Sequence, residues 1–174
     1  MNLRPKFWNA DKIVSFSAIL ISLGTMGVYI YQTHLIQKQQ YASVMPYLRM
    51  GYSFDESRFE FIIFNEGLGP ASIEEVNTYF DGKKYRYDVS TFIRGEYLKK
   101  DTLYPVTSSI EESMFFSAGK KITLLSVNNS IEKTQKLSNL FFTEKLEMEV
   151  IYSSIYGDKW IARGVGTRPK KLDD

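Results

Sequence analysis

The feature that most constrains this chain is an apolar run near its N-terminus, from Ile13 to Gln37, which holds no charged residue and lies between Lys12 and Lys38. A helix rises ~1.5 Å per residue, so about 20 apolar residues cross the ~30 Å hydrocarbon layer of a bilayer. The run is apolar on every face, whereas a helix lying on a membrane surface needs one polar face. We therefore predict a transmembrane helix over residues 13–32.

The residues before the run form a basic leader over 1–12, with Arg4, Lys6 and Lys12. A cleavable signal peptide is the competing interpretation, but the run is longer than a usual signal core and lacks the small-residue cleavage pattern. Basic residues favour the cytoplasmic side, and those three outnumber Lys38 and Arg49 beyond the run. We expect a single-pass protein of the bacterial inner membrane, with its N-terminus in the cytoplasm and its domain in the periplasm.

Good helix formers continue after the run and predict a helical stalk over residues 33–45. Pro46 favours an extended conformation for the residue before it, so the stalk ends there. The roughly 130 residues that remain are enough for one ordinary domain with its own core. We assign the domain to residues 46–166 and predict a fraying polar tail over residues 167–174.

The composition excludes several classes of function. The chain has 22 Lys and Arg against 20 Asp and Glu, so it lacks the basic excess that supplies most nucleic-acid affinity. It has no cysteine, which excludes disulfides, thiolate metal sites and a cysteine nucleophile. His34 is the only histidine and lies beyond the predicted span, so the domain cannot hold a Ser-His-Asp triad or a His-rich metal site. We predict no catalytic residue, no cofactor and no metal.

Short alternating segments between turn residues predict antiparallel strands throughout the domain. Asp81-Gly82 and Gly157-Asp158 are typical of hairpin turns, and the apolar run Phe61 to Phe64 predicts a buried, central strand. Two helices are also expected, a short one within residues 88–97, capped by Asp88 or Ser90, and one over residues 130–141. The predicted strands cover residues 47–54, 58–64, 72–80, 83–87, 106–110, 113–116, 121–127, 145–156 and 159–165.

Short strands at this close spacing favour a mainly β fold, an antiparallel immunoglobulin-like sandwich with one or two short helices. Strand number alone does not separate this fold from a small closed barrel, which stays the alternative.

The most distinctive local string runs from Asn65 to Ala71. Gly67 and Gly69 permit positive φ, Pro70 fixes φ and removes a donor, and Asn65 can bond to nearby backbone. We interpret the string as a tight structural corner. A phosphate-binding loop would need a helix after the glycines, and a β-like segment follows instead.

Together with the single span, the stalk and the hairpin from Tyr152 to Gly157, this Asn-x-Gly-x-Gly-Pro-Ala corner resembles a class of uncharacterised bacterial single-pass envelope proteins. The resemblance implies the topology and a sandwich fold. It transfers no activity and no site residue.

Aromatic residues are densest between Tyr79 and Tyr97. They predict either ordinary core packing or a platform for sugars or peptides, formed by Tyr79, Tyr85, Tyr87, Phe92 and Tyr97.

These features favour two functions. The first is a non-enzymatic accessory protein that is anchored in the lipid bilayer and presents its domain to a protein partner or to another copy of itself. The second is a cytoplasmic ligand sensor whose transmembrane segment acts on the membrane, for example in a defence system. An anchored hydrolase would need converging carboxylates or a Ser-Lys pair, and no motif indicates either.

Overall fold

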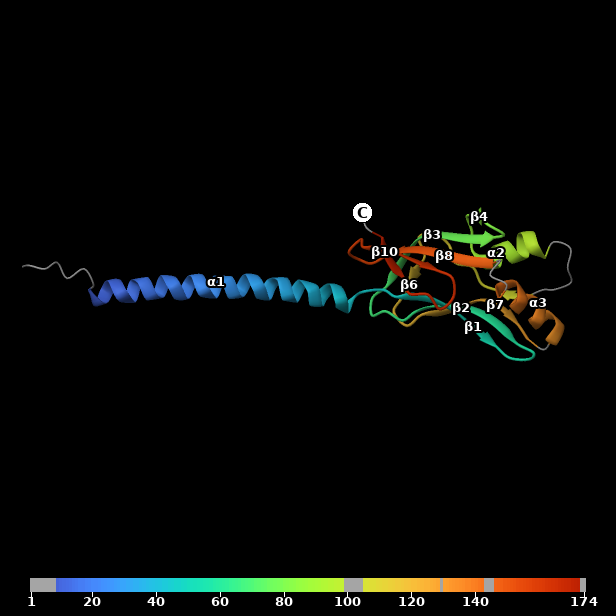
Figure 1. Ribbon diagram of the computed structural model, residues 1–174, viewed down its shortest axis with the longest axis horizontal. Helices are drawn as coiled ribbons and strands as arrows, with labels where there is room; N and C mark the ends of the chain where they lie inside the picture. The colour runs from blue at the N-terminus through green and yellow to red at the C-terminus, as the bar shows by residue number, and fades with distance from the viewer. Residues whose placement is uncertain (1–8, 99–104, 129, 143–145, 173–174) are drawn as a thin grey trace, which may run out of the picture. The chain divides into compact units, whose positions relative to one another are not determined.

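The computed structural model describes residues 9–98, 105–128, 130–142 and 146–172. It consists of two separate units, an N-terminal helix and a β domain that begins at Ser43 (Figure 1).

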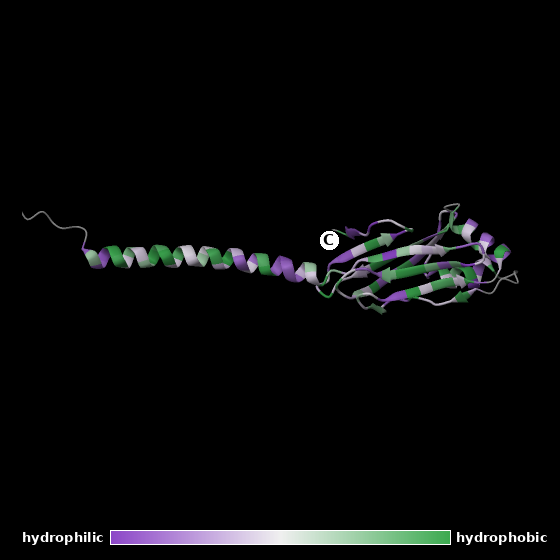
Figure 2. Ribbon diagram, turned by 90° about the horizontal axis from the view of Figure 1, so that it is seen from below, coloured by the Kyte–Doolittle hydropathy of each residue, from purple (hydrophilic) through white to green (hydrophobic). Residues whose placement is uncertain are grey.

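The helix, α1, is continuous over Ala10–Ser43. Its 34 residues span about 50 Å, and its most apolar window has a mean hydropathy of 2.0, so it is long and apolar enough to cross a membrane. Figure 2 shows hydrophilic residues mainly in its C-terminal turns. The predicted span and the predicted stalk thus belong to one helix, which ends three residues before Pro46 because proline disfavours helix there.

Four hydroxyl side chains of α1 form hydrogen bonds within the helix. The hydroxyls of Ser15, Ser22, Thr25 and Thr33 each donate a hydrogen bond to the carbonyl four residues earlier. In hydrocarbon no water is present to bond such groups, so these internal bonds suit a membrane environment.

The first sheet has four strands in the order β1-β2-β7-β5, all antiparallel. Its members are β1 (Leu48–Phe54), β2 (Phe59–Asn65), β7 (Lys121–Val127) and β5 (Val106–Thr107).

The second sheet follows the order β10-β9-β8-β3-β4, with β6 also pairing with β3, and is likewise antiparallel. Its members are β10 (Lys170–Leu172), β9 (Lys159–Arg163), β8 (Leu146–Ser153), β3 (Ala71–Phe80), β4 (Lys83–Tyr85) and β6 (Phe115–Phe116). These sheets confirm the predicted mainly β fold.

Three helical segments border the sheets at the ends of strands. Asp88 caps α2 (Val89–Phe92) by accepting the Thr91 N–H, and the chain continues as the π-helical turn η1 (Ile93–Tyr97). The third, α3 (Ile131–Phe142), turns its apolar side toward the core. Both predicted helices are therefore present.

A single core lies between the two sheets. Even-numbered residues of β8 and alternate residues of β2 point into it, so the two inner faces interdigitate. Its largest fully buried side chains include Tyr152, Phe59, Phe61, Phe92 and Phe116.

Two expectations need correction, and one alternative is resolved. β2 is central, but Ile62 and Phe64 lie half-exposed on the outer face, so the strand is buried on one face only. The tail does not fray over its whole length, because Lys170–Leu172 pair with β9 and extend the second sheet. Among the described residues the strands form two separate sheets, which does not match a closed barrel.

Candidate functional site

The strongest candidate site is a cavity of about 320 Å³ at the end of the sandwich where β1 finishes, which we call the aromatic pocket. It lies between the end of β1 and the start of β8, beside α3 and the segment that follows β9. Its lining consists of Tyr52, Phe61, Phe141, Leu146, Glu147, Met148, Arg163, Gly164, Val165 and Thr167.

Aromatic rings make up one wall of the aromatic pocket. Phe61 of β2 and Phe141 of α3 stack with their ring centroids 4.8 Å apart, and Tyr52 of β1 meets the Phe141 ring edge-on at 5.6 Å. Such contacts fix ring positions and leave an apolar surface that suits an aromatic or aliphatic group.

Two further rings lie exposed at the same end. Phe54 and Phe142 are each 52% exposed and meet edge-to-face at 5.8 Å, while Phe142 also lies 5.3 Å from Tyr52. Large apolar side chains that cluster on a surface mark sites of interaction more often than scattered ones do. Because this pair adjoins the aromatic pocket, the apolar surface continues from the cavity to the outside.

The opposite wall is charged. The Arg163 Nε donates to Glu147 at 2.9 Å, and this hydrogen bond raises the already high pKa of the guanidinium, so Arg163 stays charged. Burial raises the pKa of the Tyr52 hydroxyl, and the negative charge of Glu147 raises it further. The aromatic pocket thus offers a neutral hydroxyl, a carboxylate and a guanidinium beside an apolar wall.

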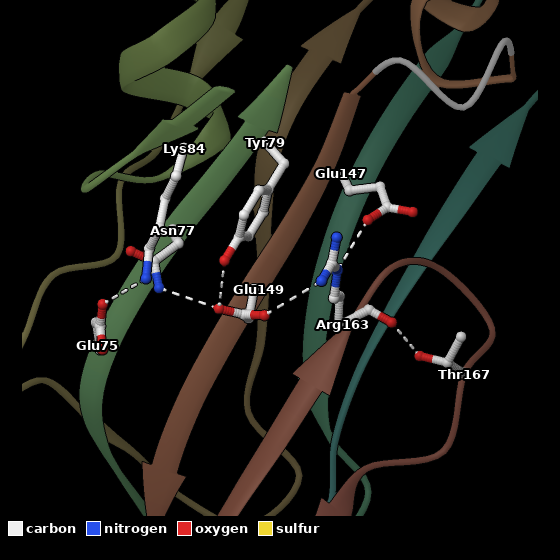
Figure 3. A network of polar contacts seen from close by, with 8 residues as sticks. All are labelled: Glu75, Asn77, Tyr79, Lys84, Glu147, Glu149, Arg163 and Thr167. Carbon is white, nitrogen blue, oxygen red and sulfur yellow. Dashed lines mark hydrogen bonds and ion pairs between the residues drawn. The ribbon is translucent and has the colours of Figure 1, made fainter. Parts of the chain in front are cut away.

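Arg163 is held in place by a polar network on the outer face of the second sheet (Figure 3). Its guanidinium lies 4.4 Å from the centre of the Tyr79 ring and 3.9 Å from Glu149. Glu149 is only 6% exposed, and its Oε1 accepts hydrogen bonds from Asn77 and from the Tyr79 hydroxyl. Fixing the guanidinium in this way preorganises the charged wall.

The network extends to the edge of the sheet. Glu75 accepts a hydrogen bond from Lys84 at 3.0 Å, and this bond, followed by one from Asn77, lowers the pKa of Glu75. On the other side, a second hollow of about 390 Å³ shares Glu147, Arg163 and Thr167 with the aromatic pocket.

Both carboxylates beside Arg163 are paired with it, and the described lining contains no histidine or cysteine. Within the described ranges, no three His, Cys, Asp or Glu side chains lie close enough together to hold a metal ion.

The structure divides the residues of the predicted aromatic platform between two places. Tyr85, Tyr87, Phe92 and Tyr97 pack against the core near α2, where Tyr85 and Phe92 lie 4.9 Å apart. Tyr79 lies on the outer face with Arg163. The five rings therefore do not form one surface.

The predicted corner lies at the other end of the sandwich, where the chain enters the domain. The Asn65 side chain is buried and bonds to five backbone groups. Its Oδ1 accepts the N–H groups of Tyr47 and Gly67, and its Nδ2 donates to the carbonyls of Gly69, Phe116 and Ser117. The corner therefore fastens the entering segment to two loops of the sandwich.

Gly67 and Gly69 are needed at the corner for space and not for their φ angles, which are not positive. A Cβ on Gly67 would lie 2.4 Å from the Met45 carbonyl oxygen, and one on Gly69 would lie 1.7 Å from the Val44 carbonyl oxygen. Pro70 follows and leads directly into β3. Our expectation about φ is thus replaced by a requirement for close backbone approach.

Sequence reasoning missed the aromatic pocket. Alternation along β8 places Glu147 and Glu149 on one face, but only the register of β8 with β9 brings Arg163 opposite Glu149. The contact of Phe141 with Tyr52 and Phe61 joins three distant segments, and no local pattern encodes it.

Comparison with protein-family models and with curated proteins finds no match to this chain.

Proposed function

We propose that this chain is a single-pass membrane protein whose β domain is a non-enzymatic binding module for a protein partner. The observation that carries the proposal is the aromatic pocket, with its exposed aromatic rim formed by Phe54 and Phe142 and its fixed Glu147–Arg163 wall. Protein interfaces are enriched in aromatic side chains and arginine, which supply most of the binding energy at hot spots.

The anchor supports this proposal. α1 has the length and hydropathy of a bilayer span and contains its own hydroxyl hydrogen bonds. The basic leader favours a cytoplasmic N-terminus. The domain then faces the periplasm of a bacterial cell.

The strand order supports an immunoglobulin-like architecture. The orders β1-β2-β7-β5 and β9-β8-β3-β4 correspond to A-B-E-D and G-F-C-C′ in such sandwiches. These domains present binding surfaces at the loops on the sandwich ends, and the aromatic pocket lies at one such end.

Two measurements test the anchor and its direction. Alkaline carbonate extraction should leave the full chain in the membrane pellet, and protease added to spheroplasts should degrade the domain. Release into the supernatant contradicts the anchor. A domain that is digested only after the membrane is lysed contradicts the periplasmic location.

Site-specific photo-crosslinking in cells tests the binding surface. A photoreactive residue in place of Phe54 should give one discrete protein adduct. Ile155, which is 57% exposed in the turn after β8 at the other end of the sandwich, is the matched control and should give none. Equal crosslinking at both positions, or at neither, contradicts a partner site at the aromatic pocket.

A cytoplasmic ligand sensor is the second candidate. The observation that favours it is the volume of the aromatic pocket, about 320 Å³, which lies at the lower end of the range of ~300–1,000 Å³ for small-molecule sites. The spheroplast experiment discriminates between the two, because a cytoplasmic domain is protected from external protease.

A further inference from the structure

The edge strand β1 has two unlike halves. The Asp55 N–H donates to the Arg58 carbonyl, and the Glu66 N–H donates to the Tyr47 carbonyl. Together with the register of the two strands, these bonds fix which residues of β1 are hydrogen-bonded to β2. Because such positions alternate along an antiparallel strand, the backbone N–H and C=O groups of the odd-numbered residues of β1 bond to β2. The even-numbered residues direct these groups away from β2.

The first half of the outer edge is closed. The Leu48 N–H donates to the Tyr152 hydroxyl at 3.3 Å, and the Met50 carbonyl accepts the Gly166 N–H at 3.3 Å. Tyr152 and the segment after β9 therefore occupy this part of the edge.

The second half is open. The outward N–H and C=O groups of Tyr52 and Phe54 have no hydrogen-bond partner among the described residues. Unpaired groups of this kind form a template onto which another strand can add.

Two other edges of the domain are protected by charge. β4 carries Lys83 and Lys84, and β10 carries Lys170 and Lys171, and lysine on an edge discourages pairing with other chains. The open half of β1 has the sequence Gly51-Tyr52-Ser53-Phe54, without lysine or proline.

The open half also adjoins the aromatic pocket. Tyr52 lines it, and Phe54 lies on its exposed rim. Even-numbered side chains of β1 point toward the space between the sheets, so a residue placed opposite Tyr52 on an added strand directs its side chain the same way, into the cavity.

We infer that an extended segment of the partner protein adds to β1 at Tyr52 and Phe54 and places an apolar side chain, aromatic or aliphatic, in the aromatic pocket. This inference rests on the proposed function and specifies how the partner is recognised. Main-chain hydrogen bonds supply affinity in such strand addition, and the pocket supplies specificity.

The surrounding charge indicates a basic residue in the same segment. The hairpin next to Phe54 carries Asp55, Glu56 and Glu60 against the single cation Arg58, which is paired with Glu60. A lysine or arginine that flanks the apolar residue complements this surface.

The probe is a peptide selected from a random octapeptide phage library on the full chain in nanodiscs, after counter-selection on empty nanodiscs. We expect selected peptides to share an apolar residue next to a basic one. Fluorescence anisotropy then measures the affinity of the best peptide for the full-length variants.

Phe54→Pro is the decisive variant, because it removes the outward N–H and leaves the bonds of β1 to β2 intact. Phe54→Ala removes the same ring but keeps the N–H. We expect Phe54→Pro to weaken binding about tenfold beyond Phe54→Ala, a difference of ~1.4 kcal/mol. Val165→Trp, which fills the cavity, should also weaken binding at least about tenfold, whereas Ile155→Ala should leave it unchanged.

Amide exchange of the wild type keeps the inference testable if Phe54→Pro does not fold. Bound peptide should slow exchange at Tyr52 and Phe54. Failure to select any peptide, equal affinity of Phe54→Pro and Phe54→Ala, or unchanged exchange at both amides overturns the inference. In each case the crosslinking at position 54 still decides the proposed function separately.

A second copy of the chain is the competing occupant. If the full chain dimerises in detergent without peptide and Phe54→Pro abolishes the dimer, then the edge pairs with itself and the inference about a partner segment is wrong.

Discussion

Replacement of Asn65 by alanine should remove a large part of the stability of the β domain. The substitution deprives the N–H groups of Tyr47 and Gly67 and the carbonyls of Gly69 and Phe116 of their side-chain partner. The bonds to the Gly69 and Phe116 carbonyls are buried, and an unsatisfied buried group costs ~1–3 kcal/mol, so the loss is roughly 2–6 kcal/mol. A domain of this size is stable by only ~5–15 kcal/mol.

Urea unfolding of the full chain in detergent measures this loss. Trp160 reports on the domain because it is buried and stacks on Tyr152 with ring centroids 5.9 Å apart, and Trp8 is replaced by Phe to leave one signal. Exposed Asn128 is the matched control, and Asn128→Ala should change stability by less than ~0.5 kcal/mol. If Asn65→Ala costs no more than this control, the corner does not fasten the entering segment.

Asn65→Asp refines the same test through pH. The new carboxylate keeps the acceptor for Tyr47 and Gly67 but places an oxygen against the carbonyls of Gly69 and Phe116. This raises its pKa in the folded state, so stability is fullest below the ordinary carboxyl pKa of ~4 and is lost as the pH rises. A variant that is more stable at pH 7 than at pH 4 contradicts the donor role of Asn65.

Two further substitutions test neighbouring contacts. Gly69→Ala should destabilise the domain by several kcal/mol, on the order of the cost of an overpacked core, because the new Cβ meets the Val44 carbonyl. Gly95→Ala is the control and should be neutral, because a Cβ at this position has open space. Equal melting temperatures of the two variants contradict the close backbone approach at Gly69. Burial raises the pKa of Tyr152 to about 12, so the folded state holds the phenol proton more tightly than the unfolded chain, and stability should fall as the pH rises through about 10 to 12. Tyr152→Phe also loses the hydrogen bond from the Leu48 N–H, so it should lower stability at neutral pH and reduce the alkaline loss of stability. Urea unfolding from pH 9 to 12 measures this loss. If the unfolding free energy of the variant falls with pH as steeply as that of the wild type, Tyr152 is not the group responsible.

Local patterns predicted most of the secondary structure. Lys121–Val127 was predicted with the bounds that the structure has, because apolar and β-branched residues fill it and turn residues flank it. The Asp81-Gly82 hairpin also follows from local chemistry, since both residues adopt positive φ in the turn. The C-terminal strand was missed because Lys170–Leu172 is short and polar, and only its pairing with β9 makes it a strand.

The aromatic pocket could not be predicted in the same way. Its rings come from β1, β2 and α3, and its charged wall depends on the register between β8 and β9. Sequence alternation assigns each side chain to a face but does not say which strands lie beside each other. For the same reason, the five aromatic residues of the predicted platform were grouped as one surface, although the pleat directs Tyr79 to the opposite face.

The most direct test of the binding surface is residue-resolved amide exchange of the full chain without any partner. Gly51 and Ser53 bond to β2, whereas Tyr52 and Phe54 face outward. We expect the amides of Tyr52 and Phe54 to exchange much faster than those of Gly51 and Ser53. Equal protection at all four positions means that this half of β1 is already paired, and the edge is then not free to receive a partner.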